Sequence, residues 1–355
     1  MIKIEDSSNS DTFKLAELFC GAGGIGLGAK LVSVENVHVE HIWATDYDKD
    51  ACATYKNNIN PKTVICEDIR NIDFEKLRKY GVIDCLTFGF PCNDFSTVGE
   101  QKGLNGVFGS LYEYCTKALK VFSPKFFIAE NVSGLRNAND GDAFIRILDA
   151  FKSVGYKLYP HLYRFDEYGI PQKRHRIIIV GIRSDLDVEF NIPSPEDYSH
   201  IDNSVITALS DIPENVSNNE RTAQSPIVIE RLKHIKEGEN AFTAHIPPHL
   251  QLNVKGAKIS QIYKRLKASE PAYTITGSGG GGTHVYHFKE NRALTNRERA
   301  RLQTFTDDFI FSGSKESVRK QIGMAVPPQG VKIIFEALLK SIHKISYNSI
   351  KGNIS

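Results

Sequence analysis

The residue best suited to covalent chemistry in this chain is a cysteine that follows a proline. In Gly89-Phe90-Pro91-Cys92, the thiol comes directly after an apolar run, Ile83 to Phe88, that is typical of a buried strand. Proline fixes its own backbone angle and donates no N–H, so it ends the strand and holds Cys92 on a stiff corner. A side chain at the carboxyl end of such a strand faces the crevice where ligands bind in α/β sheets. Cys92 is therefore a candidate nucleophile, and the competing interpretation is a small buried packing residue.

A glycine-rich turn forms a second candidate site. Gly21, Gly23 and Gly26 follow the apolar run Phe13 to Phe19, and glycines here would let the backbone approach a ligand with free N–H groups. Asp46 comes twenty residues after Gly26, at the end of the next predicted strand, where a carboxylate would accept ribose hydroxyls. The pattern suits a nicotinamide dinucleotide and S-adenosylmethionine equally, and it also suits plain turn glycines.

Three charged residues could assist a thiolate. Glu130 follows the predicted strand Phe126 to Ala129, so its carboxylate is expected at the same sheet edge as Cys92. Arg174 and Arg176 stand at the start of a later predicted strand, where alternation would put both guanidiniums on one face. There they could hold a phosphate or orient a carboxylate. The plainer interpretations are a helix-start carboxylate and two solvated arginines.

The elements that must position these residues alternate between strands and helices. Strands are predicted at 13–19, 41–45, 64–65, 83–88, 126–129 and 176–182, and helices at 49–58 and 330–344. Strands separated by helix-length segments predict an α/β fold with a doubly wound, mostly parallel sheet. From about Phe190 the chain becomes rich in proline, asparagine and serine without a regular period. We therefore expect a catalytic and cofactor-binding domain at 1–190, a smaller irregular domain at 191–320, and a segment at 321–355 that returns to the first domain.

Composition limits the class of protein. A chain of 355 residues, 41% of them hydrophobic, can bury one large core or two modest ones. No apolar run approaches the roughly 18 residues of a membrane helix, and the polar N-terminus carries no secretory core, so a cytoplasmic protein without a membrane partner is expected. The six cysteines lack metal-ligand spacing, which predicts neither a metal site nor a disulfide framework. With a net charge of only +2, any polyanion would have to be bound by local patches.

Taken together and in this order, the motifs resemble those of the bacterial DNA (cytosine-5)-methyltransferase family of restriction–modification systems. The matching segments are Phe19 to Gly24, Asp46, Asp68-Ile69, Pro91-Cys92, Glu130 to Val132, Gln172 to Arg176, Arg297 to Phe305, Gln321 to Gly323 and Ala325 to Pro328. The resemblance implies a Rossmann-like fold that uses S-adenosylmethionine, and region 191–320 as a target-recognition domain. It further implies double-stranded DNA as partner, a monomer, and a cognate restriction endonuclease that acts on the same site.

The resemblance also implies chemical roles. The Cys92 thiolate would add to carbon 6 of a cytosine flipped out of the duplex, and Glu130 would contact ring nitrogen 3. Arg174 and Arg176 would hold the target phosphate and base. Carbon 5 would then take the methyl group, and loss of its proton and of Cys92 would release 5-methylcytosine. The residues expected to bind the cofactor are Phe19, Gly21, Gly23, Gly24, Asp46, Tyr47, Asp68, Ile69, Gly89, Pro91 and Leu111.

Contacts with DNA are expected just after the nucleophile, at Gln172 and in the irregular domain. The residues are Asn93, Ser96, Gln172, Lys255, Lys258, Lys264, Arg265 and Thr274. The acid-free run from Lys255 to Lys267 suits either phosphate contacts or a solvated helix face. The glycine-punctuated stretch 97–110 is expected to form a lid over the flipped base, with a plain loop as the alternative.

Two positions depart from the family pattern. Asn93 stands where the family usually has glutamine, and Met324 where it usually has asparagine. Two alternative functions accompany the main one: methylation of a tRNA cytosine, as in one branch of the family, and DNA binding by an inactive homologue. Inactive homologues typically lose the cysteine or the glutamate, whereas this chain keeps both Cys92 and Glu130.

Overall fold

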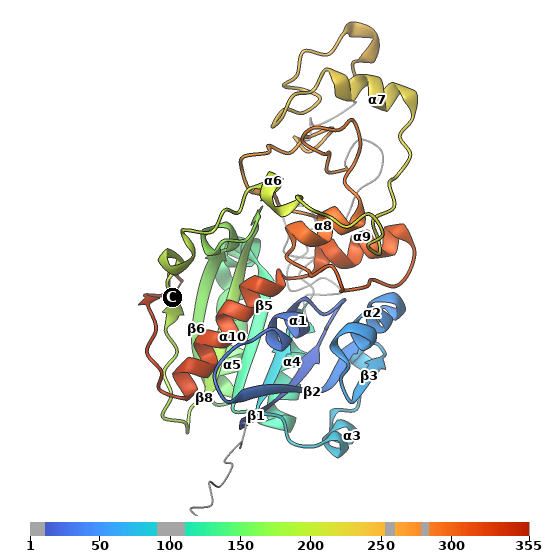
Figure 1. The fold of residues 1–355 in the computed structure, drawn as a ribbon. Coiled ribbons are helices and arrows are strands. Elements are labelled where there is room, and N and C mark those ends of the chain that lie inside the picture. The colour runs from blue at the N-terminus through green and yellow to red at the C-terminus, as the bar shows by residue number, and fades with distance from the viewer. Residues whose placement is uncertain (1–10, 91–110, 253–259, 278–283, 355) are drawn as a thin grey trace, which may run out of the picture. The chain divides into compact units, whose positions relative to one another are not determined.

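The computed structural model describes residues 11–90, 111–252, 260–277 and 284–354 (Figure 1). The chain forms two compact units. Unit 1 comprises Met1–Tyr163, His175–Ser194 and Val331–Ser355, and unit 2 comprises Arg164–Arg174 and Pro195–Gly330. These edges differ from the limits at 190 and 320 expected from composition. The assignment of 164–174 to unit 2 was not foreseen, because that short segment shows no change of composition.

Unit 1 is built on a seven-stranded sheet with the strand order β3-β2-β1-β4-β5-β8-β6. The strands are β1 (Asp11–Leu18), β2 (Val37–Asp46), β3 (Thr63–Cys66), β4 (Cys85–Phe88), β5 (Phe126–Val132), β6 (Tyr156–Arg164) and β8 (His175–Arg183). Strands β1 to β5 pair in parallel, and β8 is antiparallel to β5. The predicted mostly parallel α/β fold is confirmed, although strand β6 and the reversed direction of β8 were not predicted. A short antiparallel pair, β9 (Ile192–Pro193) with β11 (Ser349–Ile350), also belongs to this unit.

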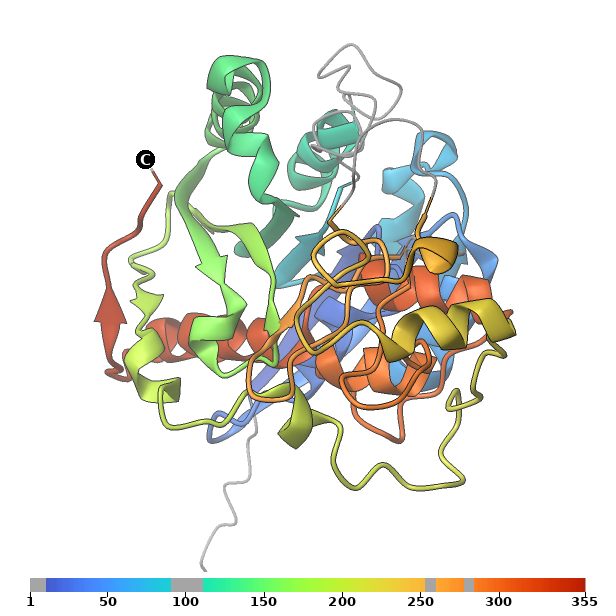
Figure 2. The same ribbon diagram turned by 90° about the horizontal axis from the view of Figure 1, so that it is seen from above.

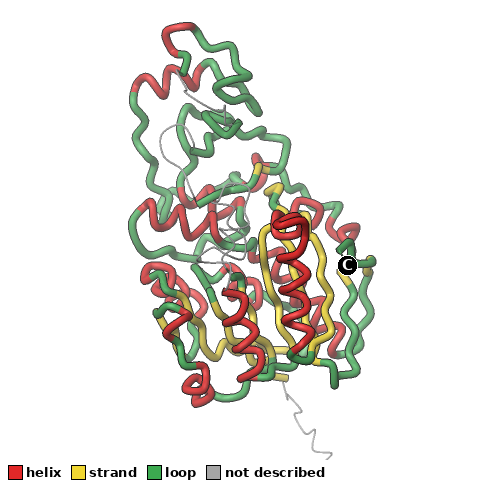
Figure 3. Tube along the Cα trace, turned by 180° about the vertical axis from the view of Figure 1, so that it is seen from behind, coloured by secondary structure: helices red, strands yellow, loops and turns green. Residues whose placement is uncertain are grey.

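Helices cover both faces of this sheet. They are α1 (Gly24–Lys30), α2 (Lys49–Ile59), α3 (Phe74–Leu77), α4 (Leu111–Phe122), α5 (Asp142–Ser153) and α10 (Pro328–Ile342). Figure 2 shows α4 and α5 on one face and α10 on the other, and Figure 3 shows helices packed over the strands from the opposite side. The backbone N–H of Ser33 donates to Glu336 at 3.0 Å, which ties the segment after α1 to α10. The predicted C-terminal helix corresponds to α10, and its apolar residues are buried.

One stretch of the chain, Lys315–Ile342, is long and apolar enough to cross a membrane by composition alone. However, 78% of its most apolar window is buried inside the structure. The stretch also breaks between residues 325 and 327, so it consists of two separate helices, of which α10 is the second. A core helix passes the same test, and burial of this kind is what such a helix shows.

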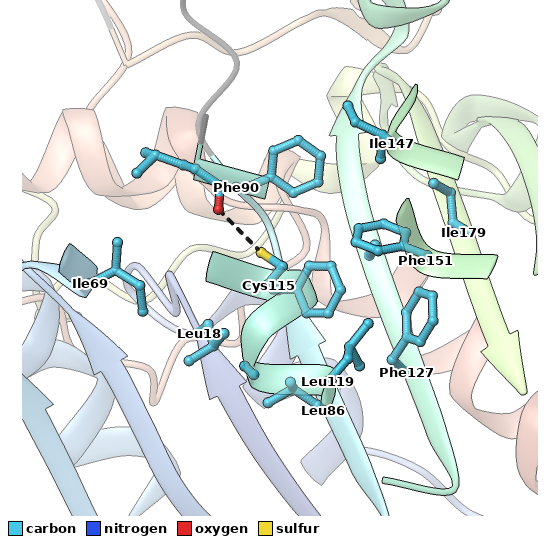
Figure 4. Packing of buried hydrophobic residues seen from close by; sticks show 14 of the residues in the cluster. Leu18, Ile69, Leu86, Phe90, Cys115, Leu119, Phe127, Ile147, Phe151 and Ile179 are labelled. Atoms are coloured by element: carbon cyan, nitrogen blue, oxygen red, sulfur yellow. Dashed lines mark hydrogen bonds between the residues drawn. The ribbon is translucent and has the colours of Figure 1, made fainter. Parts of the chain in front are cut away.

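The main apolar core of unit 1 lies between the sheet and the helices α4 and α5 (Figure 4). The rings of Phe88, Phe127 and Phe151 contact one another with centroids 5.2 to 5.6 Å apart. Aromatic pairs in such offset or edge-on arrangements add to the stability gained from burial alone. Because this cluster includes residues of β1, β4 and β5, it fixes the carboxyl ends of the strands where the candidate residues lie.

Unit 2 contains little regular structure, as its composition predicted. Among the described residues its strands are β7 (Gln172–Lys173) and β10 (Ala272–Tyr273), which pair in parallel. Its α-helices there are α6 (Val205–Ala208), α7 (Pro226–Lys233), α8 (Asn296–Leu302) and α9 (Lys315–Met324). A capping box opens α8: the Thr295 hydroxyl accepts the N–H of Glu298, whose carboxylate accepts the N–H of Thr295. Leu232, Ile235, Tyr263 and Tyr286 belong to a small apolar core of its own.

Candidate active site

Glu130 and Arg176 form an ion pair where β5 meets β8. The Nε atom of Arg176 lies 2.9 Å from Oε1 of Glu130, and only 14% and 13% of the two side chains are exposed. In the antiparallel register Glu130 pairs with Ile178 and Val132 pairs with Arg176, so the two charged residues are diagonal neighbours. Burial lowers the pKa of Arg176, and the carboxylate of Glu130 opposes that shift. The pair therefore holds a carboxylate in a fixed, largely desolvated position.

Gly89 lies on the other side of this carboxylate. Phe88 pairs with Ala129 in the parallel register, which brings the next residues, Gly89 and Glu130, to the same edge. A Cβ on Gly89 would stand 3.0 Å from Oε2 of Glu130. The absence of a side chain at this position thus leaves room for the carboxylate. Gly89 was expected to bind cofactor, and the structure places it against Glu130.

The predicted nucleophile, Cys92, lies outside the described residues. The same holds for Pro91, Asn93, Ser96, Lys255 and Lys258, and for the predicted lid at 97–110. The residue that leads into this stretch is Phe90, whose carbonyl accepts a hydrogen bond from Nδ2 of Asn131 at 3.4 Å. The end of β5 therefore supports the chain just before Pro91-Cys92. On the far side of the stretch, Leu111 is buried at the start of α4.

The turn after β1 and the end of β2 are joined through Asp46. Its carboxylate accepts the backbone N–H groups of Gly21 at 2.8 Å and of Asp48 at 2.9 Å. Burial raises the pKa of Asp46, and these two hydrogen bonds oppose the rise. Gly21 has φ +52°, and a Cβ there would meet nothing within 4 Å, so the backbone borders open space. The next residue, Tyr47, is 62% exposed.

The other glycines of this turn serve packing. A Cβ on Gly23 would stand 3.0 Å from the ring of Tyr55 in α2, and a Cβ on Gly26 would stand 2.8 Å from its hydroxyl. Gly23 also has φ +99°, which an L side chain rarely adopts. Gly24 is buried inside α1. Gly21 thus borders open space, whereas Gly23 and Gly26 face Tyr55. Phe19, which opens the same turn, has φ +53° and is partly buried.

Asp68 and Ile69 occupy the turn after β3. Asp68 accepts the backbone N–H of Arg70 at 2.9 Å and forms an ion pair with the guanidinium of the same residue. These contacts with Arg70 lower the pKa of Asp68 to about 2. Ile69 is buried beside it. Any contact of Asp68 with a cofactor would therefore be shared with Arg70.

Arg174 does not lie beside Arg176 in one strand. It precedes β8, which begins at His175, and it belongs to unit 2, so the alternation of that strand does not extend to Arg174. That both guanidiniums face the same side stays a prediction. Its side chain is 1% exposed and donates to the carbonyls of Ile275 and Gly323, each at 3.1 Å. Arg174 thus links separate backbone segments within unit 2.

Gln172 is also an interior residue of unit 2. Its Nε2 atom donates to the carbonyl of Leu302 at 3.1 Å and to the side chain of Gln303 at 2.9 Å. Its Oε1 atom accepts the N–H of Ile275 at 2.8 Å. The expected DNA contact of Gln172 is wrong for this conformation, because the amide is fully buried and used by protein groups.

Arg265 clamps the backbone of unit 2. It is 4% exposed, and its guanidinium donates to four carbonyl groups at 2.6 to 2.8 Å, those of Leu232, Ile235, His287 and Glu290. The expected phosphate contact is therefore wrong, because these donors already have partners.

The two remaining described residues of the predicted DNA-binding set are less enclosed. The Nζ atom of Lys264 lies 4.7 Å from the centre of the Tyr273 ring. The hydroxyl of Thr274 donates to the carbonyl of Lys173 at 2.8 Å. Contacts of Lys264 and Thr274 with DNA stay a prediction.

A buried acid close to the glycine turn was missed by sequence reasoning. Glu17 in β1 is 1% exposed, and Oγ1 of Thr87 donates to its Oε2 atom at 3.0 Å. Burial raises the pKa of Glu17 well above its ordinary value. An acidic residue inside the apolar run 13–19 was the signal that could have identified it.

Comparison with known proteins is consistent with this arrangement. Residues 13–340 match the model of the C-5 cytosine-specific DNA methylases. The chain is 54% identical over 353 residues to the Type II methyltransferase M.BbvI of Brevibacillus brevis, covering 96% of this chain and 94% of that protein. It is 42% identical over 341 residues to the Type II methyltransferase M.NgoFVII of Neisseria gonorrhoeae, covering 94% and 88%. A protein encoded within an Escherichia coli prophage has a similar fold, with a TM-score of 0.73 at 22% identity over 93% of this chain and 99% of that one. The chain therefore belongs to the C-5 cytosine-specific DNA methylase family and is a DNA (cytosine-5)-methyltransferase.

Proposed function

We propose that this enzyme transfers a methyl group from S-adenosylmethionine to a flipped-out cytosine of duplex DNA through a covalent bond between Cys92 and carbon 6. The observation that carries the assignment of the site is the carboxylate of Glu130, held between Arg176 and Gly89. This carboxylate stands at the carboxyl end of the strand next to β4, and β4 leads into Pro91-Cys92.

Residues at the ends of β1 and β2 fit S-adenosylmethionine. The backbone at Gly21 borders open space, the carboxylate of Asp46 stands beside it, and the ring of Tyr47 is exposed. Each carboxylate oxygen can accept more than one hydrogen bond, so Asp46 can receive ribose hydroxyls while it holds Gly21 and Asp48. The Tyr47 ring can stack on the adenine. When bound, S-adenosylmethionine supplies an electrophilic methyl group on its sulfonium sulfur.

Carbon 5 of cytosine is too weak a nucleophile to take a methyl group without activation. Addition of the Cys92 thiolate to carbon 6 forms a carbon–sulfur bond and makes carbon 5 nucleophilic. Glu130 would hydrogen-bond or protonate ring nitrogen 3 and so draw off the negative charge that builds up on the ring, with Arg176 keeping the carboxyl group oriented. After carbon 5 has been methylated it loses its proton, the carbon–sulfur bond breaks, and the thiolate of Cys92 is restored.

We further propose that the enzyme is a cytoplasmic monomer that protects DNA against a restriction endonuclease with the same target sequence. The support is the similarity to two Type II methyltransferases over most of their lengths. The alternative is methylation of a tRNA cytosine, which the assay below distinguishes from methylation of DNA. An inactive DNA-binding homologue is disfavoured because Cys92 and Glu130 are both present.

The function is tested by tritiated methyl uptake into duplex DNA and into tRNA, followed by bisulfite sequencing of the DNA. We expect label in duplex DNA, at one cytosine of a short target sequence and at each occurrence of that sequence. We expect no label in tRNA. Label in tRNA alone would overturn the proposed substrate, and label in neither would overturn the proposed activity.

A further inference from the structure

Unit 2 buries a cation for which the described part of the chain provides no partner. Arg299 in α8 is 1% exposed, and neither Nη1 nor Nη2 has a hydrogen-bond partner among the described residues. The adjacent Glu298 does not neutralise the charge of Arg299, because its carboxylate pairs with Arg292 at 2.7 and 2.8 Å. Burying an unpaired charge is strongly unfavourable, so Arg299 is placed to receive an anion.

Arg299 lines a small pocket whose charged side chains are mostly cationic. The other cations are Lys315 and Arg319, and Nε of Arg319 likewise has no partner in the described part. Among the same residues, neither Arg299 nor Arg319 forms an ion pair. The one carboxylate in the lining belongs to Glu220, which is exposed. His284 adds a ring nitrogen to the wall.

Two helices form the walls of this pocket. In α8, Asn296 and Arg299 are one turn apart, and in α9, Lys315 and Arg319 are one turn apart, so each pair lies on one helix face. The side chain of Asn296 donates to the carbonyl of Lys315 at 3.0 Å, which joins the starts of the two helices. The charged groups are therefore held together before any ligand arrives.

A third segment is fixed against the same helix starts. The Nε atom of Arg297 donates to the carbonyl of Ser217 at 3.0 Å, and Nζ of Lys315 donates to the carbonyl of Arg221 at 3.3 Å. This segment continues into Glu220 and Thr222, which also line the pocket. A pocket built from three anchored segments is preorganised, and preorganisation lowers the cost of binding.

Protonation equilibria show the positive character of this pocket. Burial, and then the charge of Arg319, lower the pKa of Arg299 to about 10. Burial, and then Arg299 and Arg319, lower the pKa of His284 to about 4, although Glu316 opposes the shift. His284 is therefore neutral at neutral pH and can donate one N–H. A bound anion would relieve the repulsion between the two arginines.

We propose that this pocket binds one phosphate group, either a backbone phosphate of DNA or inorganic phosphate. Two guanidiniums offer planar, charged donors that match the oxygens of a phosphate, and charge-assisted hydrogen bonds of this kind are among the strongest in proteins. The DNA form of the proposal rests on duplex DNA as the proposed substrate, whereas binding of inorganic phosphate does not.

The first measurement is thermal unfolding of the full-length protein in increasing inorganic phosphate, with chloride at matched ionic strength as reference. Phosphate should raise the Tm of the wild type and should have little effect on Arg319→Gln and Arg299→Met. Lys233→Gln is the matched control, because it removes an exposed cation that pairs with Glu230 elsewhere in unit 2. If Arg299→Met fails to fold, the partly exposed Arg319 still decides the result.

The second measurement is the affinity for a fixed nonspecific duplex as a function of salt. A protein that loses one phosphate contact should show a log–log slope shallower by about 0.9, so Arg319→Gln should show that loss and Lys233→Gln should not. A phosphate-dependent Tm with an unchanged DNA slope would identify inorganic phosphate as the occupant. Equal responses of wild type and Arg319→Gln in both measurements would overturn the site. Failure of the wild type to bind any duplex would contradict the proposed DNA substrate, and the Tm measurement would still decide on the pocket.

Discussion

Gly89 lies directly against Glu130: a Cβ on the glycine would be 3.0 Å from Oε2 of the carboxylate. The ion pair with Arg176, at 2.9 Å, restrains the other carboxylate oxygen. Glu130 therefore has little freedom to move, and its position depends on a residue with no side chain. That dependence can be tested without touching the carboxylate itself.

We predict that Gly89→Ala displaces the Glu130 carboxylate by a few tenths of an ångström. Because catalytic geometry is sensitive to such shifts, kcat for methyl transfer should fall about tenfold. The Tm should change little, because the added Cβ meets one side-chain oxygen and no backbone atom. Steady-state kinetics with a thermal unfolding curve checks this, and an unchanged kcat would show that the glycine does not position the carboxylate.

Removal of the partner cation should impair both stability and catalysis. Arg176→Gln leaves a mostly buried carboxylate without its ion pair, so the free energy of unfolding should fall by about 1–3 kcal/mol. For methyl transfer, kcat should fall by a larger factor than KM changes. Arg183→Gln is the control on the same strand, because its partner Asp185 is mostly exposed. Equal effects of the two substitutions would argue against a positioning role for Arg176.

The glycines after β1 should differ in what they support. Gly26→Ala places a Cβ against the Tyr55 hydroxyl, so the free energy of unfolding should fall by about 1–3 kcal/mol. The double variant Gly26→Ala, Tyr55→Phe removes the closest clashing atom and should recover part of that loss. Urea unfolding of the two single variants and the double variant measures the coupling, and strict additivity would contradict the assigned contact.

The buried Glu17 should make stability fall as pH rises. Its pKa is raised above the ordinary value of 4.5, so above that pH the folded protein holds a proton that the unfolded chain has released. Stability from this group is therefore complete below about pH 4.5 and is lost as pH rises toward the folded pKa. Glu17→Gln removes the titration and keeps an acceptor for Thr87. The free energy of unfolding of the variant minus that of the wild type should therefore be larger at about pH 8 than at about pH 5. A pH-independent difference would contradict the shift.

Local sequence patterns were sufficient to predict the framework of unit 1. The helix predicted at 49–58 corresponds to α2 at Lys49–Ile59, and the strand predicted at 126–129 begins β5. Apolar runs that end at a glycine, proline or acid reflect burial followed by chain reversal, and both are local properties of the sequence. The placement of Glu130 at a sheet edge could be predicted for the same reason.

The roles of buried polar residues could not be predicted in this way. Some residues of the types expected at a DNA-binding surface are instead enclosed by protein groups, namely Arg174, Gln172 and Arg265. The carbonyl that Arg174 contacts belongs to Ile275, which lies 101 residues later in the chain. No local pattern records such a partner, so a buried cation that binds carbonyls and an exposed cation that binds phosphate have the same sequence signal. The unpartnered Arg299 was missed for the same reason.

The most direct test of the central claim is to trap the bond to Cys92. Duplex DNA of random sequence with 5-fluorocytosine in place of cytosine should form a covalent complex with the enzyme in the presence of S-adenosylmethionine. Release of Cys92 requires loss of a proton from carbon 5, and the fluorine at that position cannot leave in its place. Peptide mass spectrometry is predicted to find the base attached to Cys92, with no complex formed by Cys92→Ala. A base attached to another residue, or a Cys92→Ala enzyme that still methylates DNA, would contradict the account.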